Sequence, residues 1–231
     1  MLLLLFAGSS SATAAGAIVG GSVAVTSDYV FRGISQTRNN PALQADLHVA
    51  PVANWTVGAW ASQVQLLPAS HSLELDYYTQ WRWPAGSQFS LTLSAVYYTF
   101  PGDPRSVPYE YAEFSGDVTW RDRFTVSYST APKVTLFSLG YGRVFNRETR
   151  SLEVSARHRL PWRLDAHAGV GYFAAIGLPN SSYLYGSAGI SRRFGAWRAE
   201  LSYYGAQGNS YRTYAPGPVG GPLAATISWH F

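Results

Sequence analysis

The chain has 231 residues, no cysteine and a formal net charge of +4, and only 13% of its residues are charged. The missing cysteines exclude a disulfide scaffold and a cysteine-built metal site. With a mean hydropathy of −0.05, the chain is too polar for a bundle of membrane helices. Its charged fraction, however, is well below the roughly 25% usual for soluble domains. This combination favours a β-sheet with one face turned to lipid, and 8 Trp, 16 Tyr and 11 Phe supply enough aromatic side chains for two interfacial girdles.

The N-terminus begins with an apolar run, Met1–Phe6, which is followed by small residues and the triplet Ala12-Thr13-Ala14. This pattern is typical of a secretory signal peptide, although the usual basic residue near the start is missing and a start farther upstream stays open. A membrane anchor is disfavoured, because a spanning helix needs about 20 apolar residues. The sequence therefore predicts a signal peptide over residues 1–14 and a barrel domain over residues 15–231.

The rest of the chain alternates apolar and polar residues, most clearly over Leu73–Trp83. Because a strand points alternate side chains to opposite faces, each such run predicts one apolar and one polar stripe. No long segment has the 3.6-residue period of a helix. The predicted strands cover residues 22–34, 42–49, 55–64, 73–83, 89–99, 111–120, 124–130, 151–160, 164–173, 183–193, 197–204 and 223–231.

The connections between these runs alternate strictly between long and short along the chain. Twelve strands with both ends in the periplasm need six outer loops and five short turns, and both counts match. The segment Val134–Phe145 could be a further strand, but a thirteenth would break the alternation, so it is assigned to an outer loop. The sequence thus predicts an all-β, transmembrane, antiparallel up-and-down barrel of about twelve strands in the outer membrane of a Gram-negative cell.

The final run places Leu223, Ala225, Ile227 and Trp229 on one apolar stripe and ends at Phe231. A last strand that ends in Phe resembles the sorting signal of outer-membrane barrels. Trp229 and Phe231 are therefore the predicted assembly signal, and the barrel-assembly machinery is the predicted partner.

A family resemblance rests on three segments: Gly21-Ser-Val-Ala-Val-Thr-Ser-Asp-Tyr-Val-Phe-Arg-Gly-Ile-Ser-Gln-Thr37, Pro41-Ala-Leu-Gln44 and Glu74-Leu-Asp-Tyr-Tyr78. They resemble the proteobacterial Gcw_chp family, also called TorF-type porins; the remainder is similar only in its strand rhythm. The resemblance implies an outer-membrane barrel that acts as a channel. It supplies neither a substrate nor catalytic residues.

The polar stripes predict a charged lumen with more acids than arginines. In the predicted facing, Asp28 lies opposite His48, Arg32 lies near Gln44 or Asp46, and Glu74 with Asp76 dominates ion preference. These charges either satisfy one another across strands or line a water-filled path that weakly prefers cations. The predicted lumen-lining residues are Asp28, Arg32, Asp46, His48, Glu74, Asp76, Arg82, Glu113, Asp117, Glu153, Arg157, Asp165, Arg198 and Glu200.

Two alternatives to a channel for small solutes or ions stay open. One is a barrel filled by side chains and loops with a structural or adhesive role; the other is an outer-membrane hydrolase. The hydrolase is disfavoured, because the five histidines have no catalytic motif spacing. No cofactor, metal or nucleic acid is predicted as a partner. Membrane lipid is the predicted surrounding. Lipopolysaccharide is a predicted partner of the basic loop residues, and a solvated loop without such a partner stays open as the alternative. These residues are Arg38, Arg105, Lys133, Arg143, Arg147, Arg150 and Arg212.

Overall fold

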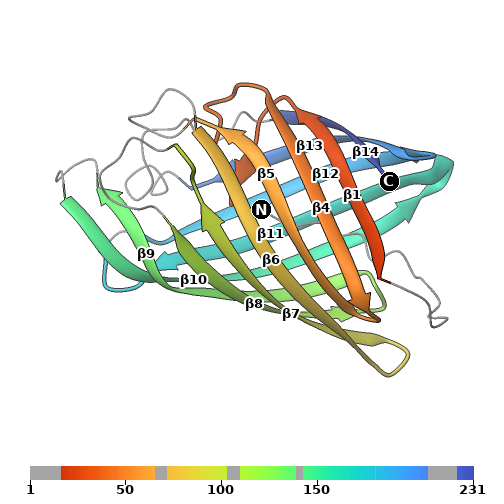
Figure 1. The fold of residues 1–231 in the computed structure, drawn as a ribbon, viewed down its shortest axis with the longest axis horizontal. Helices are drawn as coiled ribbons and strands as arrows, with labels where there is room; N and C mark the ends of the chain where they lie inside the picture. The colour runs from red at the N-terminus through yellow and green to blue at the C-terminus, as the bar shows by residue number, and fades with distance from the viewer. Residues whose placement is uncertain (1–16, 66–71, 103–109, 139–142, 180, 208–222) are drawn as a thin grey trace.

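A computed structural model describes residues 17–65, 72–102, 110–138, 143–179, 181–207 and 223–231. Twelve long strands close into an antiparallel barrel in the order β1-β14-β13-β12-β11-β10-β9-β8-β7-β6-β5-β4 (Figure 1). The barrel strands are β1 (Ile18–Thr26), β4 (Ala42–Val52), β5 (Trp55–Val64), β6 (Ser72–Ala85), β7 (Phe89–Thr99), β8 (Tyr111–Trp120), β9 (Phe124–Ser138), β10 (Arg143–Leu160), β11 (Leu164–Ala175), β12 (Tyr183–Phe194), β13 (Trp197–Ala206) and β14 (Leu223–His230).

The predicted fold class, strand number and alternation of connections are confirmed. Short connections join β4 to β5, β6 to β7, β8 to β9, β10 to β11 and β12 to β13, and the longer connections lie at the opposite end. The short helical element η1 (Pro161–Arg163) forms one of these turns. No helix in the described part of the chain is long and apolar enough to cross a membrane. The predicted signal peptide, residues 1–14, lies outside the described residues.

The first predicted strand, residues 22–34, is wrong in its second half. Strand β1 ends at Thr26, where the Thr26 hydroxyl donates to the carbonyl oxygen of Asp28. The chain then forms a separate hairpin of β2 (Val30–Phe31) and β3 (Ile34–Ser35), which is joined by Arg32 and Gly33. Both turn residues have positive φ, 49° and 77°, as a two-residue type I′ turn requires. The alternation continues through this hairpin, which explains why the sequence resembles one long strand.

The predicted outer loop at residues 131–150 is also wrong. Strand β9 continues to Ser138 and β10 begins at Arg143, so both strands extend past the predicted boundaries. Their register shifts between Arg147 and Thr149, where β10 bulges. Figure 1 shows this pair extending beyond its neighbours at the loop end of the barrel. The strand count stays at twelve, because the segment prolongs two strands rather than adding one.

The outer face of the barrel carries large exposed side chains, and its Trp and Tyr residues lie at two different heights along the strands. Seven of the eight Trp are exposed near the short turns, whereas Trp60 points inward. A second exposed set, made of Tyr, lies toward the loop end. Two aromatic levels that bound an apolar band are typical of transmembrane barrels. The exposed residues of the two levels are Trp55, Trp81, Trp83, Trp120, Trp162, Trp197 and Trp229, then Tyr77, Tyr97, Tyr128, Tyr172 and Tyr203.

The barrel closes where β1 meets β14, with Ser22 opposite His230 and Thr26 opposite Thr226. Two backbone hydrogen bonds of 3.1 Å join Phe231 to Gly21 beyond the end of β14. The Phe231 ring lies so close to Gly21 that a Cβ there would be 2.6 Å from it. The terminal residue therefore contributes directly to the closing seam.

Deletion of Phe231 is expected to leave most of the chain unfolded in the periplasm. It removes both the predicted assembly signal and the two seam hydrogen bonds. Cell fractionation combined with heat-modifiable migration on gels measures the folded, membrane-inserted fraction. A normal amount of folded barrel in the outer membrane after the deletion would contradict the role given to Phe231.

Candidate functional site: a hairpin in the barrel lumen

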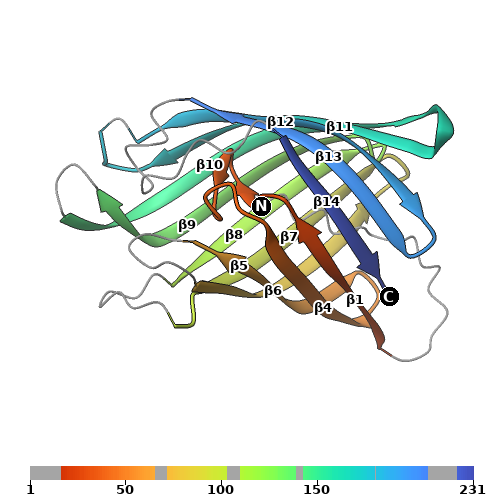
Figure 2. The same cartoon turned by 90° about the horizontal axis from the view of Figure 1, so that it is seen from above.

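The hairpin β2–β3 lies inside the ring of strands (Figure 2). It starts from β1 but reaches Glu113 on β8 and Ser129 on β9. In the barrel order, β1 and β8 are separated by β4, β5, β6 and β7 on one side and by six strands on the other. The hairpin therefore crosses the lumen instead of lying against its own wall. We call residues Asp28–Gln36 the lumen hairpin.

The base of the lumen hairpin is held by the Asp28 carboxylate. Its Oδ1 accepts hydrogen bonds from the hydroxyls of Ser35 (2.5 Å) and Thr37 (2.7 Å). The Thr37 hydroxyl in turn accepts one from the backbone N–H of Tyr29, and the N–H of Gln36 donates to the Tyr29 carbonyl at 2.7 Å. The predicted pairing of Asp28 with His48 is wrong, because His48 lies opposite Gly20 on β1.

The tip of the lumen hairpin is held by Arg32. One Arg32 guanidinium nitrogen donates to both carboxylate oxygens of Glu113, at 2.9 and 2.8 Å, and to the Ser129 hydroxyl at 2.8 Å. The guanidinium also lies over the rings of Phe31 and Phe173, at 4.7 and 5.4 Å from their centroids. Arg32 is thus bound on the far wall, and its predicted place near Gln44 or Asp46 is wrong.

The Arg32–Glu113 ion pair is removed from solvent. Only 11% of the Arg32 side chain and 10% of the Glu113 side chain are exposed. Burial acts to lower the pKa of Arg32, but the Glu113 carboxylate together with Tyr185, Tyr98 and Tyr111 holds that pKa above its ordinary value. The guanidinium therefore stays charged, and removal of either partner would leave the other buried without its counter-charge.

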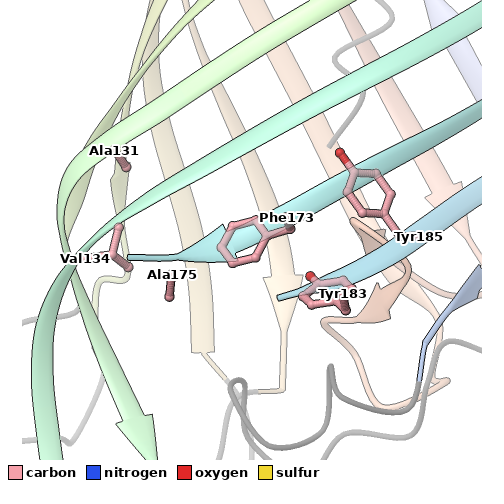
Figure 3. Close-up of a cluster of buried hydrophobic side chains, with 6 residues drawn as sticks. All are labelled: Ala131, Val134, Phe173, Ala175, Tyr183 and Tyr185. Carbon is pink, nitrogen blue, oxygen red and sulfur yellow. The ribbon is translucent and has the colours of Figure 1, made fainter. Parts of the chain in front are cut away.

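An aromatic cluster on the wall receives the tip. Phe173 on β11 and Tyr183 and Tyr185 on β12 form its centre (Figure 3), with 5.4 Å between the ring centroids of Phe173 and Tyr183. Ile34 of the lumen hairpin packs against this cluster. On the other side of the tip, Phe31 contacts Tyr98, which stacks on Tyr111 at 4.5 Å. Apolar contacts and one ion pair together hold the hairpin across the lumen.

Glu74 and Asp76 lie beneath the lumen hairpin, on the inward face of β6. Both are buried, with 4% and 0% of their surface exposed. The Tyr29 hydroxyl donates to Glu74 at 3.3 Å, and burial raises the pKa of Tyr29, which keeps it protonated. No side chain among the described residues donates a hydrogen bond to either oxygen of Asp76. The pair predicted to dominate ion preference is therefore covered in this arrangement.

Three other predicted lumen acids, Asp46, Asp117 and Glu153, lie on β4, β8 and β10. Asp46 bonds to His48 Nδ1 at 2.6 Å and accepts from the Tyr78 hydroxyl at 2.7 Å. The Tyr78 ring packs over Gly58. A Cβ at position 58 would be only 2.5 Å from that ring, so the contact requires glycine. Asp117 is half-buried on β8, and Glu153 on β10 accepts from the Tyr185 hydroxyl at 3.0 Å. In the described part of the chain, no Lys or Arg forms an ion pair with Asp117 or Glu153.

The remaining predicted residues lie in local pairs. Arg198 on β13 bonds to Glu200 at 2.9 Å. Asp165 lies 3.6 Å from Arg159 near a short turn. Two predicted arginines reach the same turn residue, Asp122: Arg82 binds its carboxylate at 2.9 Å, and Arg157 donates to its carbonyl oxygen.

A polar recess of about 210 Å³ opens on the lumen near the seam. Its walls combine the Arg198–Glu200 pair with Trp60, whose ring contacts Tyr29 of the lumen hairpin at 5.3 Å. Arg198 and Glu200 form an ion pair of 2.9 Å, so their charges offset each other in the wall of the recess. The recess is also lined by Ser22, Ala24, Gln44, Ala45, Thr226, Ser228 and His230.

One cluster superficially resembles a hydrolase site. Ser202 Oγ lies 3.3 Å from His167 Nε2 and donates to Glu200 at 2.9 Å. The same imidazole nitrogen also faces Glu200, at 3.8 Å. In a catalytic triad the two ring nitrogens have separate partners, one the nucleophile and the other the carboxylate, so this geometry differs from a triad. No three His, Cys, Asp or Glu side chains of the described residues converge as metal ligands would.

The hairpin-binding residues on the far walls could not be found from the sequence. Ser129, Phe173 and Tyr185 belong to ordinary alternating strands, and only the closed barrel brings them to Arg32. One sequence feature that could have indicated the hairpin is the pair Arg32-Gly33, since Gly favours the positive φ of a tight hairpin turn. Trp60, on the polar stripe of its strand, was the other irregularity, and it contacts the lumen hairpin.

The fold is a closed antiparallel barrel with an inward hairpin, and solved porin structures have a similar fold. The structure is similar to the KdgM porin, with a TM-score of 0.55 and 10% identity over 93% of this chain and 99% of that chain. The NanC porin gives 0.54 and 9% identity, over 91% and 98%. A family model described as "Bacterial protein of unknown function (Gcw_chp)" matches residues 10–220. The chain belongs to the Gcw_chp family. No curated protein matches its sequence.

Proposed function

We propose that this protein is an outer-membrane channel for small solutes or ions, narrowed by the lumen hairpin. The observation that carries the proposal is the placement of the hairpin: a twelve-stranded barrel has room for more than wall side chains, and the chain inserts one short hairpin across that space. At the tip, one ion pair joins Arg32 of the hairpin to Glu113 on the far wall, beside the apolar contacts of Phe31 and Ile34. A small number of contacts thus controls how much of the lumen is open.

The outer face of the barrel indicates the environment of the protein. Its aromatic levels and apolar band suit a bilayer, so membrane lipid is the proposed environment. The exposed basic residues at the loop end, among them Arg38 and Lys133, suit the anionic groups of lipopolysaccharide. Two other predicted contacts, Arg105 and Arg212, lie outside the described residues. The assembly machinery remains the proposed partner of the last strand.

A weak preference for cations is the proposed selectivity. Asp117 and Glu153 face the lumen without a described basic partner, whereas Glu113 and Glu200 are neutralised by Arg32 and Arg198. Acids in a low-dielectric passage focus their field on passing ions. The preference should fade as salt rises, because the screening length falls from about 10 Å at 0.1 M to about 3 Å at 1 M.

The test is the reversal potential in planar bilayers under a salt gradient, with a chelator present. The double substitution of Asp117→Asn and Glu153→Gln should move it toward anions. The control, Asp165→Asn, removes one carboxylate beside Arg159 at the turn end and should move it much less. Anion preference in the native protein, or an equal change in the control, would overturn the proposed selectivity. No current from either the native protein or an Arg32→Ala variant would favour the filled-barrel alternative.

A further inference from the structure

Glu74 and Asp76 form an acidic pair that the proposed selectivity does not use. They occupy successive inward positions of β6, about 7 Å apart along the strand at roughly 3.3 Å per residue. Across the sheet, Asp76 lies opposite Trp60 on β5 and Tyr98 on β7, so aromatic residues flank it on both sides. Tyr29 of the lumen hairpin lies over the pair and bonds to Glu74.

The charge of this pair needs a partner. Carboxylates withdrawn from water are stable only when they are paired, coordinated or neutralised. Asp76 is fully buried, yet neither of its oxygens has a hydrogen-bond donor among the described residues. Within the same part of the chain, no Lys or Arg forms an ion pair with Glu74 or Asp76. The only described hydrogen bond to Glu74 is the long one from Tyr29.

We propose that Glu74 and Asp76 bind one divalent cation of the Ca²⁺ type beneath the lumen hairpin. Two carboxylates match its charge and supply up to four oxygen ligands. Neutral oxygens lie beside them: the Tyr29 hydroxyl, which contacts Glu74, and the hydroxyl of Ser62, which lies opposite Glu74 on β5 and is also buried. Ca²⁺ takes six to eight oxygens at about 2.3–2.6 Å in flexible geometry.

The surroundings favour Ca²⁺ over Mg²⁺. Mg²⁺ demands a near-ideal octahedron and usually keeps several of its waters, whereas this pair is enclosed by Tyr29, Trp60 and Tyr98. A cation here joins β6 to the hairpin through the oxygen of Tyr29. The site therefore links cation binding to the position of the hairpin, a role separate from ion preference in the open lumen.

The test is Ca²⁺ titration of the full chain, refolded in detergent free of lipopolysaccharide and treated with a chelator, followed by calorimetry. One Ca²⁺ per chain is expected, with a dissociation constant of about 10⁻⁴ to 10⁻³ M, the range of extracellular sites. Asp76→Asn and Glu74→Gln should each weaken binding at least tenfold, and Tyr29→Phe should weaken it less. The control, Asp117→Asn, removes another inward carboxylate and should leave the affinity unchanged.

Heat-modifiable migration shows that each variant is folded, so lost binding cannot be ascribed to unfolding. The inference is overturned if the folded native chain takes up no Ca²⁺ at millimolar concentration, as expected if the pair binds a proton instead. It is also overturned if Asp76→Asn binds Ca²⁺ as tightly as the native chain. Calorimetry in detergent does not depend on conduction. A conducting barrel without Ca²⁺ binding therefore refutes only this inference, and a Ca²⁺-binding barrel without conduction refutes only the proposed function.

Discussion

Arg32→Ala should release the lumen hairpin from the far wall while leaving the barrel closed. The substitution leaves Glu113 buried without its counter-charge, and breaking such a pair costs about 3–5 kcal/mol. Since 1.4 kcal/mol is a tenfold change in an equilibrium constant, the population of the released hairpin should rise at least 100-fold. The barrel strands keep their full ladder of hydrogen bonds, so the loss is local.

Thiol labelling measures this release cleanly, because the chain has no cysteine. Ile34→Cys places one thiol on the hairpin, at a position that packs against the aromatic cluster. A water-soluble maleimide should label it slowly in the native background and much faster with Arg32→Ala. Arg159→Ala, which removes an exposed arginine at the turn end, is the matched control and should leave the rate unchanged. Equal labelling rates in all three proteins would show that Arg32 does not hold the hairpin.

Leu93→Arg should destabilise the barrel by about 2–4 kcal/mol, the cost of an arginine on the lipid face near the bilayer midplane. Leu93 lies near the middle of β7, points outward and is 54% exposed. The neighbouring change, Thr92→Arg, places the same group inside the lumen, opposite Asp117 on β8. It should be tolerated and should shift selectivity toward anions.

Urea titration of refolded protein in lipid vesicles compares the two variants. They differ by one position in one strand, so they share strand propensity and differ only in which face receives the charge. Similar losses of unfolding free energy for Leu93→Arg and Thr92→Arg would contradict the facing of β7. A larger loss for Thr92→Arg would reverse it.

The barrel was predictable because its strands and turns are encoded by residues that are close together in the sequence. Alternation within runs such as Leu73–Trp83, and the spacing of long and short connections, are set by a two-residue period and by turn chemistry. The strand boundaries were less predictable. The hairpin β2–β3 keeps the same alternation as β1, although the chain leaves the wall after Thr26 and turns back at Arg32 and Gly33, which both have positive φ. For β9 and β10, the segment Val134–Phe145 could be read as a strand, but the alternation of long and short connections favoured a loop, because lengthening of two neighbouring strands leaves that alternation unchanged.

The site was less predictable because its contacts join distant strands. Glu113 and Arg32 were both expected in the lumen, but their 2.8 Å ion pair depends on a hairpin that crosses the barrel. A register drawn for a flat sheet places Arg32 beside its sequence neighbours on β4. The covering of Asp76 follows from the same crossing, because Tyr29 reaches β6 only after the chain leaves β1.

Single-channel recording of the native protein beside Arg32→Ala tests the central claim most directly, because that claim is that the lumen hairpin obstructs a conducting barrel. The native protein should give small unitary currents, and Arg32→Ala should give larger or longer openings as the hairpin leaves the lumen. The control, Arg159→Ala, should match the native record. Identical currents from the native protein and Arg32→Ala, or no current from either, would contradict the claim.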